Sequence, residues 1–269
     1  GEPALVMAID RRAYVTVCKT PGSGIEVESE DLPDLTPRQR EPIITAARFA
    51  QTFAGTQAGL RISVRSQIPP SAGLGSSAAV AAATAAAVGE LMGTPLPRDA
   101  VYHASLDAER SVHGTPSGVD PAIATYGGIV LFKRGHPLTT IPSRNMIPLI
   151  VGSTGVERRT GDLVSKVAAL KQKHPELTSG IIEVAGLIAT RAREAVVKGD
   201  MVQLGELMNV NHGLLSAVGV SDPSLEKLVY AARKAGALGA KLTGAGGGGC
   251  MIALVEPQRQ SDWLLVQFE

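Results

Sequence analysis

The chain has 269 residues, enough for one large domain or two small ones with a substantial buried core. Hydrophobic residues make up 44% and charged residues 19%, values typical of a globular protein that argue against intrinsic disorder. The 26 basic side chains nearly cancel the 25 acidic ones, which excludes a positive field that would bind nucleic acid or an anionic membrane non-specifically. Two cysteines, Cys18 and Cys250, are too few for a disulfide framework and favour a cytoplasmic location.

The first half of the chain combines strand-like and helix-like segments. Two runs rich in β-branched residues, 5–9 and 13–18, flank a polar break and predict a hairpin. Residues 72–92 are mostly alanine, which is too weakly apolar for a membrane span and predicts a buried helix from about 75 to 91. Hydrophobic periodicity predicts three more elements: a helix around 43–50, a strand over 60–68 and a helix over 97–112.

The second half is dominated by helical periodicity. Two strands are expected at 128–133 and 147–151, and the change in composition there predicts a domain boundary, with domains 1–146 and 147–269. Residues 163–234 are interrupted by three turn-like segments, which predicts four successive helices. A strand over 238–242, a turn over 244–249 and a strand over 250–255 follow.

A glycine-rich turn joins the strand that ends at Pro69-Pro70 to the alanine-rich helix. Free N–H groups and the dipole at such a helix N-terminus bind phosphate, and Ser76 and Ser77 either cap the helix or ligate a metal that bridges phosphates. A plain glycine turn is the alternative. The turn also fits the dinucleotide fingerprint GxGxxA, but Arg61 and Arg65 on the preceding strand argue against a strand buried on both faces.

A second glycine run lies between the last two predicted strands. It matches GxGxxG, but it leads into a strand, whereas a dinucleotide-binding fingerprint leads into a helix. Each of the four consecutive glycines 246–249 costs about 0.5–1 kcal/mol relative to alanine unless the backbone needs it. The run therefore predicts positive φ angles or close packing against another loop, with a plain hairpin turn as the alternative.

Two carboxylates stand near predicted structural transitions. Glu109 lies in the last turn of a predicted helix, where it opposes the helix dipole unless a cation is bound. Asp120 follows a tight Pro-Ser-Gly turn that would hold it in a cleft as the proton acceptor for an alcohol. A solvated surface charge and an ordinary turn are the alternatives. The other histidines, His103, His136, His174 and His212, show no metal-ligand spacing and receive no catalytic role.

Residues 69–78 and 243–250 resemble the second and third signature motifs of the GHMP kinases, and residues 113–128 resemble the archaeal branch that acts on mevalonate. The resemblance implies an α/β chain of two-layer α+β type, with an N-terminal ATP-binding domain and a helix-rich C-terminal domain. It also implies ATP-dependent phosphorylation of the primary hydroxyl of mevalonate. A sister kinase acting on phosphomevalonate or homoserine, and a non-catalytic sensor that binds ATP and a small alcohol, are the alternatives.

The resemblance further implies residue roles. It assigns Mg²⁺ to Ser77 and Glu109, and it makes Asp120 the acceptor of the hydroxyl proton. It places the ATP phosphates on a loop of nine residues: Pro70, Ser71, Ala72, Gly73, Leu74, Gly75, Ser76, Ser77 and Ala78. Weaker matches suggest substrate contacts at Ser117, Thr160 and Gly246. The turn 243–249 is expected to support the phosphate loop.

The resemblance also implies partners. We expect a small-molecule substrate and neither nucleic acid nor membrane, and we leave the oligomeric state open, with a homodimer as one alternative.

The family's first motif, Pro-Gly-Lys, supplies a lysine beside the catalytic aspartate. The sequence contains only what would follow that motif, beginning at Gly1, and the segment after Val255 is shorter than the family's. We therefore expect a longer protein that carries the lysine, and we expect a chain without the lysine to be inactive.

Overall fold

The computed structural model of the chain describes residues 2–70, 72–113, 116–143, 146–156 and 160–256. The chain folds into two compact units. The first, called here the α1–α4 unit, consists of Met7–Pro70 and Gly75–Gly128. The second, the α5–α8 unit, consists of Gly1–Val6, Ser71–Leu74 and Ile129–Glu269. The predicted boundary between residues 146 and 147 stays a prediction.

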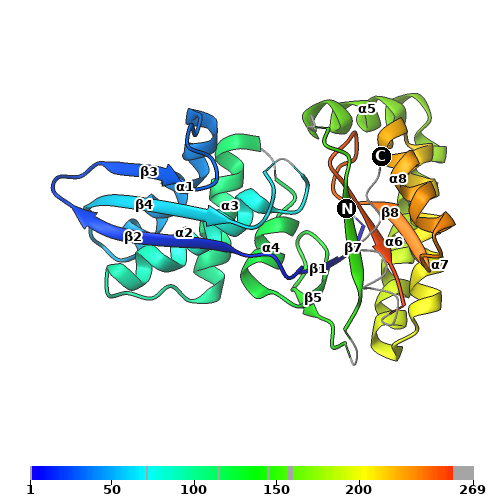
Figure 1. The fold of residues 1–269 in the computed structure, drawn as a ribbon, viewed down its shortest axis with the longest axis horizontal. Coiled ribbons are helices and arrows are strands. Elements are labelled where there is room, and N and C mark those ends of the chain that lie inside the picture. Colours follow the sequence, from blue (N-terminus) through cyan, green and yellow to red (C-terminus); the bar gives the residue numbers. More distant parts are fainter. Residues whose placement is uncertain (1, 71, 114–115, 144–145, 157–159, 257–269) are drawn as a thin grey trace. The chain divides into compact units, whose positions relative to one another are not determined.

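The α1–α4 unit is a three-stranded sheet with helices against one face (Figure 1). Leu60, Ile62 and Val64 point into the core, while Arg61 and Arg65 point away from it, so the expected alternation along this strand is confirmed. The sheet order is β2–β4–β3, and the elements are β2 (Ala13–Thr20), β3 (Ile25–Ser29), α1 (Pro37–Phe53), β4 (Gly59–Ser66), α2 (Ser76–Leu91), α3 (Arg98–His113) and α4 (Val119–Tyr126).

The expected N-terminal hairpin is wrong. The strand β1 (Ala4–Met7) pairs with β5 (Ile129–Phe132), which in turn pairs with β6 (Thr139–Thr140). The strand β2 instead runs antiparallel to β4 along its whole length, from Ala13 opposite Ser66 to Thr20 opposite Gly59. The break at residues 10–12 has no glycine or asparagine to form a two-residue hairpin turn, so long-range pairing prevails.

Alanines set the spacing of the helices in this unit. Five of them, each at most 1% exposed, pack α1, α2 and α3 together: Ala46, Ala81, Ala85, Ala104 and Ala108. Small side chains let helices approach closely, and so the N-terminus of α2 is held at a fixed place beside α3. The helix α4 was not predicted, because its Pro121 suggested a turn; the proline lies in the first turn, where a helix tolerates it.

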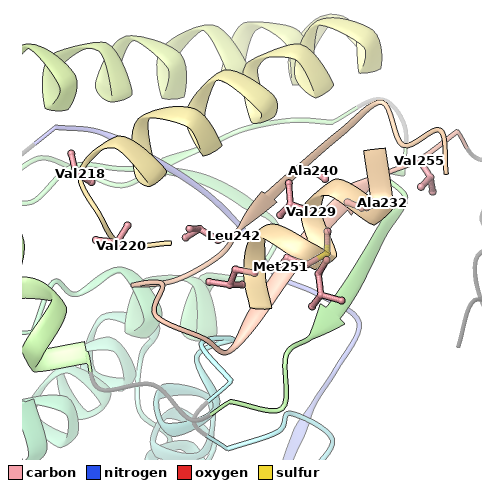
Figure 2. Close-up of a cluster of buried hydrophobic side chains, with 11 residues drawn as sticks. Val218, Val220, Val229, Ala232, Ala240, Leu242, Met251 and Val255 are labelled. Atoms are coloured by element: carbon pink, nitrogen blue, oxygen red, sulfur yellow. The ribbon is translucent and has the colours of Figure 1, made fainter. Parts of the chain in front are cut away.

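The α5–α8 unit contains the predicted four helices, which are confirmed together with their three interruptions. The sheet order is β7–β9–β8, all antiparallel. Val218, Val220, Leu242 and Met251 belong to the buried cluster that joins this sheet to the last helix (Figure 2). The elements are β7 (Leu149–Ser153), α5 (Thr160–Lys173), α6 (Pro175–Lys198), α7 (Met201–Ala217), α8 (Pro223–Lys234), β8 (Gly239–Leu242) and β9 (Cys250–Leu254).

In the part of the chain that the structure describes, no helix combines the length and the apolar character needed to cross a membrane. The alanine-rich segment forms the buried helix α2, as expected.

Candidate functional site

The glycine loop, defined as residues 70–78, runs into α2 and includes its first three residues. Gly73 and Gly75 have φ angles of +82° and +73°, in the left-handed region that side chains rarely adopt. Gly75 is the N-cap of α2, and no side chain caps the helix from that position. Among the described residues no side chain caps the N–H groups of the first turn, which is the condition for binding an anion at a helix N-terminus.

The two serines of this loop have different environments. The Ser76 hydroxyl donates to the carbonyl of Ile68 at 3.2 Å, so it ties the start of α2 to the end of the preceding strand. Ser77 is exposed. Of the two hydroxyls that the sequence offers, Ser77 is therefore the one accessible to a ligand. Ser71 lies outside the described residues.

Asp120 lies against Gly75, the loop residue directly before α2. It sits in the first turn of α4, which begins after Gly118 with a φ of +84°. A Cβ added to Gly75 would lie 3.5 Å from both the Cβ and the Cγ of Asp120. The structure thus brings together the loop and the carboxylate that the sequence separates by more than 40 residues.

Glu109 completes a pair of carboxylates. Burial on α3 raises its pKa to about 7, and the negative charge of Asp120 acts in the same direction. A partly buried carboxylate whose ionisation a neighbouring carboxylate disfavours would be stabilised in its charged form by a nearby cation. Among the described residues no group of three or more His, Cys, Asp or Glu side chains is placed to hold a metal ion. Any cation here needs further oxygen ligands.

Ser105 was not singled out from the sequence. It is fully buried on α3, one helical turn before Glu109, and its hydroxyl donates to the carbonyl of Ala78 in α2 at 3.0 Å. This bond joins the first turn of α2 to the helix that carries the carboxylate. The signal in the sequence is a polar residue among the apolar positions Val101, Ala104 and Ala108.

The glycine turn (residues 243–249) has the backbone that its composition predicts. Gly246, Gly247, Gly248 and Gly249 all have positive φ. A Cβ on Gly246 would lie 2.0 Å from the carbonyl oxygen of Val220, and one on Gly248 would lie 2.9 Å from that of Val156. The expectation of close packing against another loop is confirmed.

The weaker substrate candidates lie in different places. Ser117 is exposed, and its hydroxyl accepts the Val119 N–H at 3.3 Å, a local bond just before α4. Thr160 begins α5, and its side chain is outside the described residues. Gly246 packs on Val220 through its backbone.

A helix N-terminus with uncapped donors, an accessible hydroxyl and two interacting carboxylates has the composition of a site for phosphoryl transfer from a nucleotide. The protein is thus of the kinase class. The family model described as "GHMP kinases N terminal domain" matches residues 41–128, and "GHMP kinases C terminal" matches residues 192–263. The chain belongs to the GHMP kinase family, and the expected α+β GHMP fold is confirmed.

Individual proteins of this family are similar to the chain over most of its length. The chain is 42% identical to mevalonate kinase of Aeropyrum pernix over 94% of its own length and 82% of the relative's. It is 39% identical to mevalonate kinase of Pyrococcus horikoshii, over 97% of this chain and 84% of that one. The crystal structure of L. major mevalonate kinase in complex with R-mevalonate superposes with a TM-score of 0.86 at 32% identity, covering 97% of this chain and 83% of that one.

Proposed function

We propose that the protein transfers the γ-phosphoryl group of ATP to the primary hydroxyl of mevalonate. Identities of about 40% with mevalonate kinases over most of the chain support this substrate. The observation that carries the chemistry is the carboxylate pair, Glu109 and Asp120, placed against the glycine loop at the start of α2. ATP and a small alcohol are the ligands, and we further propose a cytoplasmic protein.

The glycine loop is the proposed phosphate site. Its nine residues, 70–78, lead into a helix N-terminus whose dipole favours negative charge. Gly73 and Gly75 let the backbone turn so that N–H groups face a ligand. A side chain at Gly75 would also occupy the space beside Asp120, where the attacking hydroxyl has to fit.

Ser77 and Glu109 are the proposed ligands of Mg²⁺. An accessible hydroxyl and a carboxylate are the hard oxygen donors that this ion prefers, and phosphate oxygens supply the remaining ligands in kinases. The raised pKa of Glu109 fits the assignment, because a cation would offset the charge of Asp120 and the cost of burial. When bound, Mg²⁺ neutralises charge on the phosphates.

Asp120 is the proposed proton acceptor. Its carboxylate lies beside the start of α2, so an alcohol bound there would face both the acid and the phosphates. Removing the hydroxyl proton as the oxygen attacks is worth about 10²–10⁴-fold in rate. Ser117, three residues before Asp120 in the chain, is proposed to orient this carboxylate or the substrate, and Thr160 and Gly246 remain proposed substrate contacts.

The substitution Asp120→Asn tests the proposal in the full-length protein. We expect kcat for mevalonate phosphorylation to fall by about 10²–10⁴-fold with little change in ATP affinity, because only the proton acceptor is lost. A coupled assay for ADP release measures the rate. Asp107→Asn is the matched control, since Asp107 lies on the exposed side of α3 in an ion pair with Arg110. A near-normal kcat for Asp120→Asn would remove Asp120 from the mechanism.

Substrate identity is tested by the same assay with three alcohols. Turnover of mevalonate in preference to phosphomevalonate or homoserine is expected. Consumption of either of the other two without mevalonate would assign a sister kinase. Binding of ATP and an alcohol with no ADP release would instead assign a sensor.

The substitution Ser77→Ala tests the metal ligand. We expect the concentration of Mg²⁺ that gives half-maximal rate to rise about tenfold, because one of two protein ligands is lost. Ser76→Ala is the control, since the Ser76 hydroxyl is engaged with the Ile68 carbonyl and should alter stability rather than metal dependence. An unchanged Mg²⁺ dependence in Ser77→Ala would count against the assignment.

A further inference from the structure

The outer edge of β8 is covered by side chains of a helix. Among the described strands β8 pairs only with β9, so its other edge presents free backbone groups. Asn209 of α7 bonds to the backbone here twice: its Oδ1 accepts the Ala240 N–H at 3.0 Å, and its Nδ2 donates at 3.3 Å to the carbonyl of Leu238, the residue before β8. His212 bonds to the edge as well, because its Nδ1 accepts the Leu242 N–H at 3.3 Å.

Two glycines allow this arrangement. A Cβ on Gly239 of β8 would lie 2.2 Å from the carbonyl oxygen of Gly205 in α7, so the two backbones touch. Gly205, Asn209 and His212 are spaced four and three residues apart and share one face of α7. Side chains on this face of α7 therefore form the hydrogen bonds with the edge of β8 that a neighbouring strand would otherwise form. His212 makes the bond nearest the C-terminal end of β8.

His212 also reaches a second element. Because its Nδ1 accepts a hydrogen bond, the ring proton of the neutral imidazole is on Nε2, which lies 3.3 Å from Oε2 of Glu226 in the first turn of α8. The histidine is 3% exposed. It thus links the end of β8 to the start of α8 from within the protein.

The glycine turn is anchored at both of these elements. It begins directly after Leu242, the residue that His212 holds. Inside the turn, the Gly247 N–H donates at 2.8 Å to the carbonyl of Val220, just before α8. The side chains of Leu242 and Val220 both belong to the same buried cluster (Figure 2). The contact between His212 and Glu226 therefore links the end of β8 to the start of α8, the two elements beside which the glycine turn is held.

We propose that His212 is a positioning residue for the glycine turn, whose neutral imidazole fixes the end of β8 and releases it on gaining a second proton. The reason is geometric: a protonated Nδ1 becomes a donor and can no longer accept the Leu242 N–H. The link from the turn to catalysis rests on the proposed function and on the expectation, taken from the family resemblance, that this turn supports the phosphate loop.

The charged groups around the His212 ring determine on which side of neutral pH the hydrogen bond to Leu242 is lost. Burial lowers the pKa of His212 and is the largest influence, Glu226 of α8 opposes it, and the cations Arg233 of α8 and Lys241 of β8 lower the pKa further. Lys241 donates to the Leu242 carbonyl at 2.7 Å, so both the N–H and the carbonyl of Leu242 are bonded to side chains. The net effect keeps the imidazole neutral at neutral pH, and the Leu242 bond is lost only on the acid side.

Amide hydrogen exchange tests the proposal without reference to activity. In His212→Leu at pH 7 we expect exchange at the Leu242 amide to speed up by about tenfold, because its acceptor is gone. His212→Asn places an amide oxygen as many bonds from Cβ as Nδ1, so it should retain protection and, having no titratable ring, retain it in acid. His174→Asn, on an exposed residue before α6, is the control. Thermal unfolding at pH 7 verifies that each variant is folded.

The pH dependence of exchange is measured in the unmodified protein, so this part of the test does not require the His212→Leu variant to fold. Exchange at Leu242, corrected for its intrinsic pH dependence, should rise on the acid side of pH 6.5 in the unmodified protein and stay flat in His212→Asn. Equal pH profiles in the two proteins would overturn the proposal. So would unchanged exchange in His212→Leu.

The catalytic arm separates this inference from the proposed function. In the full-length enzyme, His212→Leu should raise KM for ATP about five- to tenfold and change kcat less, because the residue touches neither reactant. An altered exchange at Leu242 with unaltered KM and kcat would overturn the positioning role. Absence of kinase activity from the unmodified enzyme would refute the proposed function and leave the exchange result in support of His212 as the anchor.

Discussion

Glu109 is a carboxyl group whose ionisation the folded protein disfavours. A carboxyl whose pKa is about 7 is half protonated near neutral pH, and the physical causes are burial and the neighbouring Asp120. Groups with strongly shifted pKa values are common at functional sites, where a bound ligand offsets the free-energy cost of the charged form. Free protein and ligand-bound protein should therefore differ in the charge that this residue carries.

The substitution Glu109→Gln makes that cost measurable. Since the pKa is raised in the folded state from 4.5 to about 7, the fold loses stability as pH rises between these values, and the full loss is present above pH 7. The neutral amide removes this loss, so the variant should gain at most about 3 kcal/mol at pH 8 and almost nothing at pH 4.

Thermal unfolding at both pH values, without nucleotide or metal, measures this difference. Asp107→Asn is again the control, because that exposed carboxylate belongs to an ordinary surface ion pair. A Glu109→Gln melting temperature that tracks the unmodified protein from pH 4 to pH 8 would contradict the raised pKa. Kinase activity of this variant should fall despite its greater stability, since the proposed Mg²⁺ ligand is lost.

At the scale of elements, the site depends on how α2, α3 and α4 are spaced. The buried alanines allow close helix contacts, and Ser105 adds one hydrogen bond across the α2–α3 contact at the level of the first turn of α2. Helix packing alone permits small sliding motions. A directional bond selects one arrangement, which places Glu109 one turn beyond it on α3.

The substitution Ser105→Ala should lower the free energy of unfolding by about 1 kcal/mol, the usual worth of one buried hydrogen bond. The Ala78 carbonyl stays within its own helix, so the penalty for an unpaired acceptor is small. Chemical denaturation measures the loss. Ser111→Ala is the matched control: the Ser111 hydroxyl donates to the Ala108 carbonyl of its own helix at 2.7 Å and, among the described residues, bonds to no second element.

A second readout separates positioning from stability in this variant. If Ser105 sets the place of Glu109, the Mg²⁺ dependence of the rate should weaken in Ser105→Ala and stay normal in Ser111→Ala. Equal Mg²⁺ dependence in both variants would reduce Ser105 to a purely stabilising residue.

At the scale of the whole molecule, pairing between distant strands defines the fold. The strand β1 joins β5, more than 120 residues later, and β7 joins β9, about 100 residues later. Local patterns predicted these strands within a few residues, because alternation and turn residues are properties of the segments themselves. Partner choice was not predictable from local patterns, and the expected hairpin failed for this reason.

The two short strands β3 and β6 and the helix α4 were missed for a related reason. The strand β3 alternates Glu26 and Glu28 with apolar residues over only five positions, and it becomes a strand by pairing with β4. The helix α4 contains Pro121 and follows a glycine, so local propensity favours a turn there. In each case tertiary contacts outweigh a weak local preference.

The sequence alone determined which chemical groups are present: a glycine loop before an alanine-rich helix, two candidate carboxylates and a run of four glycines. Each of these is visible in the order of the residues themselves. Only the tertiary structure decided which groups meet. Asp120 lies against Gly75, and burial together with the charge of Asp120 raises the pKa of Glu109. The Ser76 hydroxyl is hydrogen-bonded to Ile68 while Ser77 is exposed, and His212 accepts the N–H of the last residue of β8. Burial and contact between distant segments depend on packing, and a local pattern contains no information about distance.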